Sequence, residues 1–121
     1  EKNVDKIAMY EKREMEDAEI AVVAYGSAAR TSLRAVREAR KLGIKAGMIR
    51  LITIWPFYDK LIEETANQVR SIVVPEMNMG KIVREVERAS KGQASVLSVP
   101  KVGGVLHHPD EILAAIKKAA R

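Results

Sequence analysis

Apolar residues fall in four short, nearly continuous runs along the chain, and stretches with helical spacing separate these runs. The runs cover Ile20–Ser27, Ala46–Thr53, Ser71–Pro75 and Ala94–Val99. A continuous apolar run of this length, rich in valine and isoleucine, is typical of a strand that is buried on both faces of a parallel sheet. We therefore predict four parallel strands.

Between these runs, apolar residues recur every three or four positions, which is the pattern of a helix with one buried face. The clearest case is the set Met79, Ile82, Val83, Val86 and Ala89, which ends before Gly92. The predicted helices run from about Ala28 to Gly43, from after Pro56 to Gln68, from Met79 to Ala89 and from Pro109 to Arg121. Gly and Pro stand at their ends, where helices favour them.

Strands that alternate with helices imply right-handed crossovers and helices on both faces of the sheet. We therefore predict an α/β fold, a three-layer α/β/α sandwich around a mainly parallel sheet. Residues 18–121 suit a single domain. Residues 1–17 are highly charged, with a thin apolar stripe, and predict an exposed linker helix from a preceding domain. Because the chain begins at Glu1 without a methionine, we expect it to be part of a longer polypeptide or trimmed at its start.

The amino-acid composition excludes several classes of function. The 21 Lys and Arg against 16 Asp and Glu give a net charge of +5, which permits an anionic partner. Aromatic residues are few and are not interleaved with basic ones, so we expect no nucleic-acid surface. The absence of cysteine excludes disulfides, thiol nucleophiles and cysteine-bound zinc or iron–sulfur clusters within this chain. No apolar run approaches the roughly 20 residues of a membrane span, and the composition fits a cytoplasmic protein.

The turn Gly26-Ser27 leads into a predicted helix, whose free N–H groups favour anions. With one glycine and no lysine after it, the turn lacks a full phosphate-binding motif. We favour the simpler interpretation, in which Gly26 makes the turn and Ser27 caps the helix. The helix also carries a basic stripe with spacings of four, three and four, which either docks an acidic partner or is solvated: Arg30, Arg34, Arg37 and Lys41.

Polar residues follow the third predicted strand abruptly, at Glu76, Asn78 and Gly80. In open parallel sheets, ligands and partners meet the protein beyond the carboxyl ends of the strands. However, no base, nucleophile or second carboxylate stands nearby to complete a catalytic pair. We favour a capped turn in which Asn78 starts the next helix and Glu76 contacts a neighbouring chain.

Two further groups have simple structural interpretations. His107 and His108 are adjacent, a poor spacing for one metal ion, and His108 is well placed at a helix start. Trp55 begins an aromatic cluster at a strand end, where it either covers the core or anchors an interface.

The chain resembles a known family over about residue 20 to its end. The motifs that carry the resemblance are VVAYGSAAR at Val22–Arg30, AVREARKLGIKAGMIRLITIWPF at Ala35–Phe57, VVPEMNMGKIVREV at Val73–Val86 and PDEIL at Pro109–Leu113 after a Gly-Gly loop. In this order they resemble the C-terminal domain of the alpha subunit of 2-oxoacid:ferredoxin oxidoreductases. More distantly, the chain is similar to the C-terminal domain of transketolase and of pyruvate dehydrogenase beta subunits. It departs from the family pattern at Tyr58, where proline is usual, and at Lys81, where glutamine is usual.

The resemblance implies a parent complex that oxidatively decarboxylates a 2-oxoacid with thiamine diphosphate and magnesium. Electrons pass through iron–sulfur clusters to ferredoxin, and an acyl-CoA forms. These sites are expected in other domains and in the beta subunit, because the chain lacks the family's G-D-G…N thiamine motif. The resemblance thus implies a non-catalytic assembly domain with no catalytic, cofactor or metal residues of its own. It also implies core strand order 2-1-3-4, sometimes with an antiparallel edge strand.

Two rival functions remain open. The domain could belong to a transketolase or a 2-oxoacid dehydrogenase beta-type enzyme. Alternatively, it could be an independent anion- or nucleotide-binding module that uses Gly26, Ser27 and Arg30. The sequence leaves open which 2-oxoacid is used and whether the chain forms oligomers. Residues Gly26, Ser27, Arg30, Trp55, Glu76, Asn78 and Gly80 are the candidate interface or anion contacts.

Overall fold

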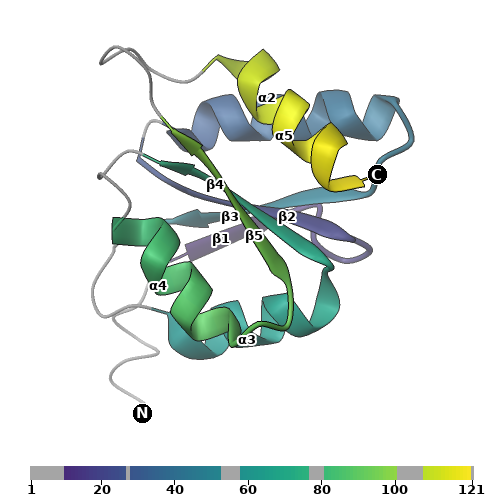
Figure 1. Cartoon of the computed structure of the whole chain (residues 1–121). Coiled ribbons are helices and arrows are strands. Elements are labelled where there is room, and N and C mark those ends of the chain that lie inside the picture. The colour runs from purple at the N-terminus through teal and green to yellow at the C-terminus, as the bar shows by residue number, and fades with distance from the viewer. Residues whose placement is uncertain (1–9, 27, 53–57, 77–80, 101–107, 121) are drawn as a thin grey trace.

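A computed structural model describes residues 10–26, 28–52, 58–76, 81–100 and 108–120. These residues form strands and helices that alternate along the chain, as the hydrophobic pattern predicts (Figure 1). In chain order the elements are β1 (Tyr10–Arg13), β2 (Ile20–Tyr25), α2 (Ala28–Lys41), β3 (Ala46–Leu51), α3 (Asp59–Gln68), β4 (Ser71–Glu76), α4 (Lys81–Ser90), β5 (Ser95–Pro100) and α5 (Pro109–Ala120).

The five described strands form one sheet in the order β1-β3-β2-β4-β5. Strands β3, β2, β4 and β5 are parallel, and β1 pairs antiparallel with β3 at one edge. The four parallel strands therefore lie in the order second, first, third, fourth along the chain, which is the order that the family resemblance implies.

The linker helix predicted for residues 1–17 is wrong where the structure describes it. Tyr10–Arg13 form strand β1, in register with Met48–Leu51 of β3. The open edge of β3 offers a row of backbone hydrogen-bonding groups, and pairing with them outweighs the weak local preference for helix. The Tyr10 ring also packs edge-on against Tyr58, with the ring centroids 5.7 Å apart. Residues 1–9 lie outside the described residues.

Helices cover both faces of the sheet and give the three predicted layers (Figure 1). On one face, α2 and α5 pack over Val22, Met48 and Val73. On the other face, α3 and α4 pack over Val23, Ile49 and Ile72. The alternation of side chains along each strand thus supplies two separate cores. Among the described residues, no helix is both long and apolar enough to cross a membrane.

The turn between β1 and β2 is fixed against the sheet by a close backbone approach. A Cβ atom at Gly47 would lie 2.6 Å from the carbonyl oxygen of Glu14 and 2.6 Å from the sulfur of Met15. Gln68 of α3 donates a 2.7 Å hydrogen bond to the Met15 carbonyl. The turn therefore belongs to the folded core, and Met15 is buried.

Arg40 of α2 forms hydrogen bonds that hold the same turn in place. Its Nε donates to the carbonyl of Ala46 at 2.7 Å, and its Nη2 donates to the Glu14 carbonyl at 2.7 Å and to the Asp17 carboxylate at 2.6 Å. This hydrogen bond from Arg40 lowers the pKa of Asp17 below its usual value. One guanidinium thus joins α2, β3 and the turn after β1.

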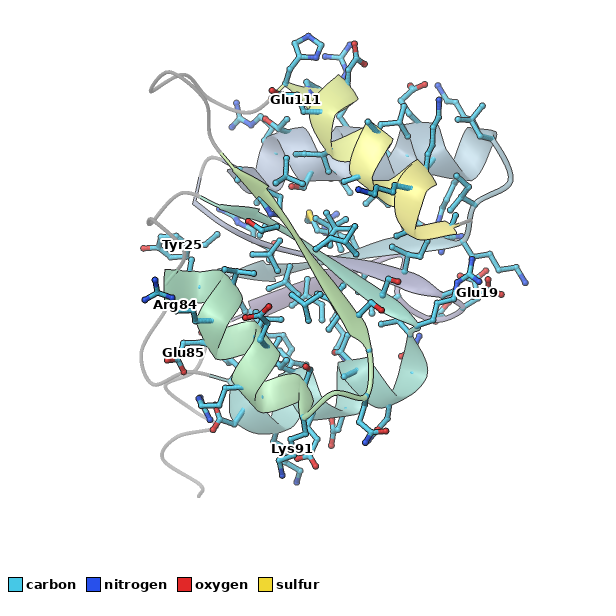
Figure 2. The ribbon with its side chains drawn as sticks, in the orientation of Figure 1. Glu19, Tyr25, Arg84, Glu85, Lys91 and Glu111 are labelled. Carbon is cyan, nitrogen blue, oxygen red and sulfur yellow. The ribbon has the colours of Figure 1, made fainter. Side chains whose placement is uncertain are left out.

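The pairs of neighbouring strands differ in how many residues they pair. The β2–β3 and β4–β5 ladders each pair six residues, whereas β2 and β4 pair only from Ile20 opposite Ser71 to Val22 opposite Val73. Pro75, near the end of β4, has no N–H to donate. The ladder between the two central strands therefore stops before their carboxyl ends, where Tyr25 projects on the side of α4 (Figure 2).

Candidate functional site

A surface hollow lies beside α2, over the edge of the sheet formed by β3 and β1. It has a volume of about 590 Å³, and both charged and apolar residues line it. We call it the arginine hollow. Its lining residues are Glu11, Arg13, Gly26, Ala29, Arg30, Thr31, Leu33, Met48 and Arg50.

The antiparallel pairing of β1 places the charged residues of two strands on one face. Glu11 lies opposite Arg50, and Arg13 lies opposite Met48. The Glu11 Oε1 atom is 3.5 Å from Arg50 Nη1 and 4.0 Å from Arg13 Nη2. One carboxylate oxygen is thus shared by two guanidiniums at long distances, which leaves donor capacity on both arginines.

Arg30 enters the hollow from the first turn of α2. Its side chain is exposed, and among the described residues it has no hydrogen bond or ion pair. Gly26 makes the turn from β2 with a φ of +66°, a conformation that favours glycine. Its carbonyl accepts a 3.1 Å hydrogen bond from the N–H of Ala29.

The structure brings two of the seven predicted site residues together, Gly26 and Arg30. Glu76 ends β4, where it is in register with Pro100 of β5. The other four predictions lie outside the described residues: Ser27, Trp55, Asn78 and Gly80.

The rest of the basic stripe follows Arg30 along the outer face of α2. Arg34, Arg37 and Lys41 are exposed in this chain, and Lys41 pairs with Glu38 at 3.2 Å. Of the four stripe residues, only Arg30 lines the arginine hollow.

Sequence reasoning missed Glu11, Arg13 and Arg50. The first two were missed because the segment was predicted to be helical, and their two-residue spacing puts them on one face only in a strand. A signal for Arg50 was present, since it is the single charged residue in an otherwise apolar strand.

His108 has a structural role at the start of α5, as its place in the sequence indicates. Its backbone N–H donates to Glu111 Oε1 at 2.8 Å, and its Nδ1 accepts from the N–H of Asp110 at 3.1 Å. This reciprocal pattern is that of a helix capping box. Figure 2 shows Glu111 at this end of the helix.

The chemistry that the arginine hollow offers is anion binding. Its three guanidiniums can pair with phosphate or carboxylate groups, and its one carboxylate, Glu11, is already close to two of them. Across the described ranges, no group of three or more His, Asp or Glu residues has the arrangement to hold a metal ion.

Comparison with known families assigns the fold. The pyruvate:ferredoxin oxidoreductase core domain II family matches residues 18–112, which covers β2 to the start of α5. The chain belongs to this family.

Curated relatives of this core domain II chain are similar over nearly its whole length. The 2-oxoglutarate synthase subunit KorA of Methanocaldococcus jannaschii is 46% identical over 95% of the chain. Its counterpart in Methanothermobacter marburgensis is 44% identical over 90% of the chain. The ketoisovalerate oxidoreductase subunit VorB of the latter organism is 39% identical over 92% of the chain. The chain spans only 29% to 31% of the length of these relatives.

Solved structures share the core domain II fold at low sequence identity. A 2-oxoglutarate:ferredoxin oxidoreductase from Magnetococcus marinus gives a TM-score of 0.79 at 17% identity and covers 98% of this chain and 21% of its own. A split gene transketolase gives a TM-score of 0.73 at 21% identity and covers 86% of this chain and 39% of its own. These likenesses confirm the predicted α/β class and its similarity to the transketolase C-terminal domain.

Proposed function

We propose that this chain is the non-catalytic assembly domain of the alpha subunit of a thiamine diphosphate-dependent 2-oxoacid:ferredoxin oxidoreductase. The family match over residues 18–112 carries the proposal. The curated relatives are named as subunits of 2-oxoacid oxidoreductases, and the chain corresponds to less than a third of each. The reaction of the whole enzyme therefore needs other parts of the polypeptide and other subunits.

The cofactors belong to those other parts in this proposal. Iron–sulfur clusters need thiolates, and the chain has no cysteine. It also lacks the family's thiamine diphosphate motif, so its residues do not fit that cofactor or its magnesium ion. We place these groups in the preceding domain and in the beta subunit, and we assign ferredoxin and CoA to the complex as partners, in the cytoplasm.

The carboxyl edge of the sheet is the side that we propose to face the other domains. Glu76 ends β4, and Trp55, Asn78 and Gly80 come after β3 or β4 in the sequence. Loops at the carboxyl ends of parallel strands are where such folds contact ligands and partners. A strand-end interface would let the domain shape the surroundings of an active site without supplying a catalytic group.

For the substrate, 2-oxoglutarate is the 2-oxoacid that we propose. The relatives with 44% and 46% identity are named 2-oxoglutarate synthase subunits, whereas the ketoisovalerate oxidoreductase subunit is 39% identical. The assembled enzyme should therefore have a higher kcat/KM with 2-oxoglutarate than with ketoisovalerate.

The test compares the isolated chain with the assembled enzyme. The 121-residue chain alone is expected to show no CoA-dependent reduction of ferredoxin with 2-oxoglutarate, with thiamine diphosphate and magnesium present. Co-expression of the complete alpha subunit with its beta subunit should give activity. Removing residues 18–121 from the alpha subunit should abolish that activity and release the beta subunit in size-exclusion chromatography.

Calorimetry of thiamine diphosphate binding tests whether the chain is non-catalytic. Tight stoichiometric binding of thiamine diphosphate to the 121-residue chain would overturn the assignment as a non-catalytic domain. Transketolase activity of the assembled enzyme, with no ferredoxin reduction, would favour the rival enzyme class.

A further inference from the structure

We propose that the arginine hollow binds the phosphate monoester group of a small organic ligand. This proposal does not depend on the proposed function. Three observations on the described residues support it: the charge of the hollow, the position of Arg30 on its helix, and the size and lining of the hollow.

The charge of the hollow is unbalanced. Arg13, Arg30 and Arg50 face a single carboxylate, Glu11, which leaves a net charge of +2. Glu11 uses one oxygen for two arginines, at 3.5 and 4.0 Å, beyond the usual length of a charge-assisted hydrogen bond. A phosphate monoester carries a charge of about −1.5 to −2 at pH 7 and three acceptor oxygens, so it matches both the charge and the spare donors.

The position of Arg30 is unfavourable for the helix unless an anion is near. The first turn of α2 contains no acidic residue, and it carries Arg30 instead. A cation there opposes the positive end of the helix dipole, whereas an anion would be stabilised by that dipole and by the free N–H groups. A bound phosphate would therefore offset the repulsion between Arg30 and its own helix terminus.

The size of the hollow favours an organic phosphate over the bare ion. At about 590 Å³ it falls within the range of ligand sites, roughly 300–1,000 Å³. Met48 and Leu33 are among its lining residues and supply apolar surface. We therefore expect the phosphate to pair with the arginines while an uncharged body, such as a nucleoside, covers the apolar residues.

The test uses adenosine 5′-monophosphate as the probe, titrated calorimetrically into the 121-residue chain at constant ionic strength. We expect saturable binding with one site per chain. Adenosine and inorganic phosphate should each bind at least about tenfold more weakly. Adenosine lacks the phosphate that pairs with the arginines, and inorganic phosphate lacks the nucleoside that covers the apolar residues.

Variants separate this site from general charge attraction. Arg30→Ala should weaken binding about tenfold or more, since it removes a charge-assisted contact. Arg34→Ala is the matched control, because Arg34 lies on the same helix and is exposed but does not line the hollow. It should change the affinity by less than about twofold, the effect of a distant surface charge. Glu11→Gln should tighten binding severalfold, since it removes the competing carboxylate.

Three results would overturn the proposal. The first is no saturable binding of adenosine 5′-monophosphate up to millimolar concentration. The second is equal weakening by Arg30→Ala and Arg34→Ala, which would show nonspecific attraction to the basic stripe. The third is equal affinity for 2-oxoglutarate, a dicarboxylate, which would show that the hollow does not recognise a phosphate monoester.

Discussion

At the scale of single residues, this fold depends on a few positions where side-chain size or charge is tightly constrained. Gly47 is one, since the backbone of the β1–β2 turn occupies the space that its side chain would need. Arg40 is another, because its guanidinium satisfies two backbone carbonyls far apart in the sequence. Both residues hold the turn that leads β1 to the edge of the sheet.

Gly47→Ala should destabilise the chain by about 1–3 kcal/mol, the usual cost of overpacking a core. The added methyl group would lie 2.6 Å from a backbone carbonyl oxygen, which is not free to move away. Urea unfolding followed by circular dichroism measures the change. The control is Ser98→Ala at an exposed position of β5, expected to stay within about 0.5 kcal/mol. Equal stability of the two variants would show that the turn does not pack on Gly47.

At the scale of elements, a charged link joins α3 and α4 across their surface. Arg88 of α4 donates two hydrogen bonds to Asp59 of α3, at 2.9 and 2.8 Å, and also contacts Glu85 at 2.6 Å. The two hydrogen bonds from Arg88 lower the pKa of Asp59 below its ordinary value of 3.8. Ionised Asp59 is therefore the form that the folded state favours.

This link predicts a pH dependence of stability. Because the pKa of Asp59 is lower in the folded state, its contribution is present at neutral pH and is lost as the pH falls below about 4. Asp59→Asn should be slightly less stable than the natural chain at pH 7, and the difference between the two should shrink as Asp59 becomes protonated in the folded chain. The loss should be small, and smaller still in high salt, because both side chains are more than half exposed.

Thermal unfolding from pH 2 to 7 measures the convergence. Glu64→Gln is the control, since Glu64 is exposed on the same helix and has no ion pair within the described part of the chain. A stability difference between Asp59→Asn and the natural chain that stays constant across this range would contradict the assignment.

The contrast between β1 and the other strands shows how far the sequence predicts this fold. The four parallel strands and the helices from Ala28 onward follow from local hydrophobic periodicity, which is a property of neighbouring residues. Strand β1 depends on pairing with β3, about 38 residues away, and its own residues carry little strand preference. The arginine hollow was only partly predicted for the same reason, because Glu11 and Arg13 reach it through that pairing.

At the scale of the whole molecule, β1 completes the sheet on one side. Its residues Glu11, Lys12 and Arg13 are charged, and charged side chains on an edge strand discourage pairing with other chains. The strand thus covers the apolar edge formed by β3.

Removing residues 1–13 should therefore expose the edge of β3 and cause the chain to self-associate. Light scattering coupled to size-exclusion chromatography would show a larger mass for a chain that begins at Glu14. The control is a chain that begins at Tyr10 and keeps the whole of β1. An unchanged mass for the shorter chain would show that β1 does not protect the edge.

The short ladder between β2 and β4 has a consequence for how the domain is divided. Strands β1, β2 and β3 with α2 all lie within residues 10–51, and β4 and β5 with the other described helices lie within residues 59–120. The weakest backbone pairing in the sheet thus coincides with a single crossing point in the chain. The two consecutive halves are therefore held together more by side-chain packing, with α2 against α5 and shared apolar cores on both faces of the sheet, than by backbone hydrogen bonds between β2 and β4.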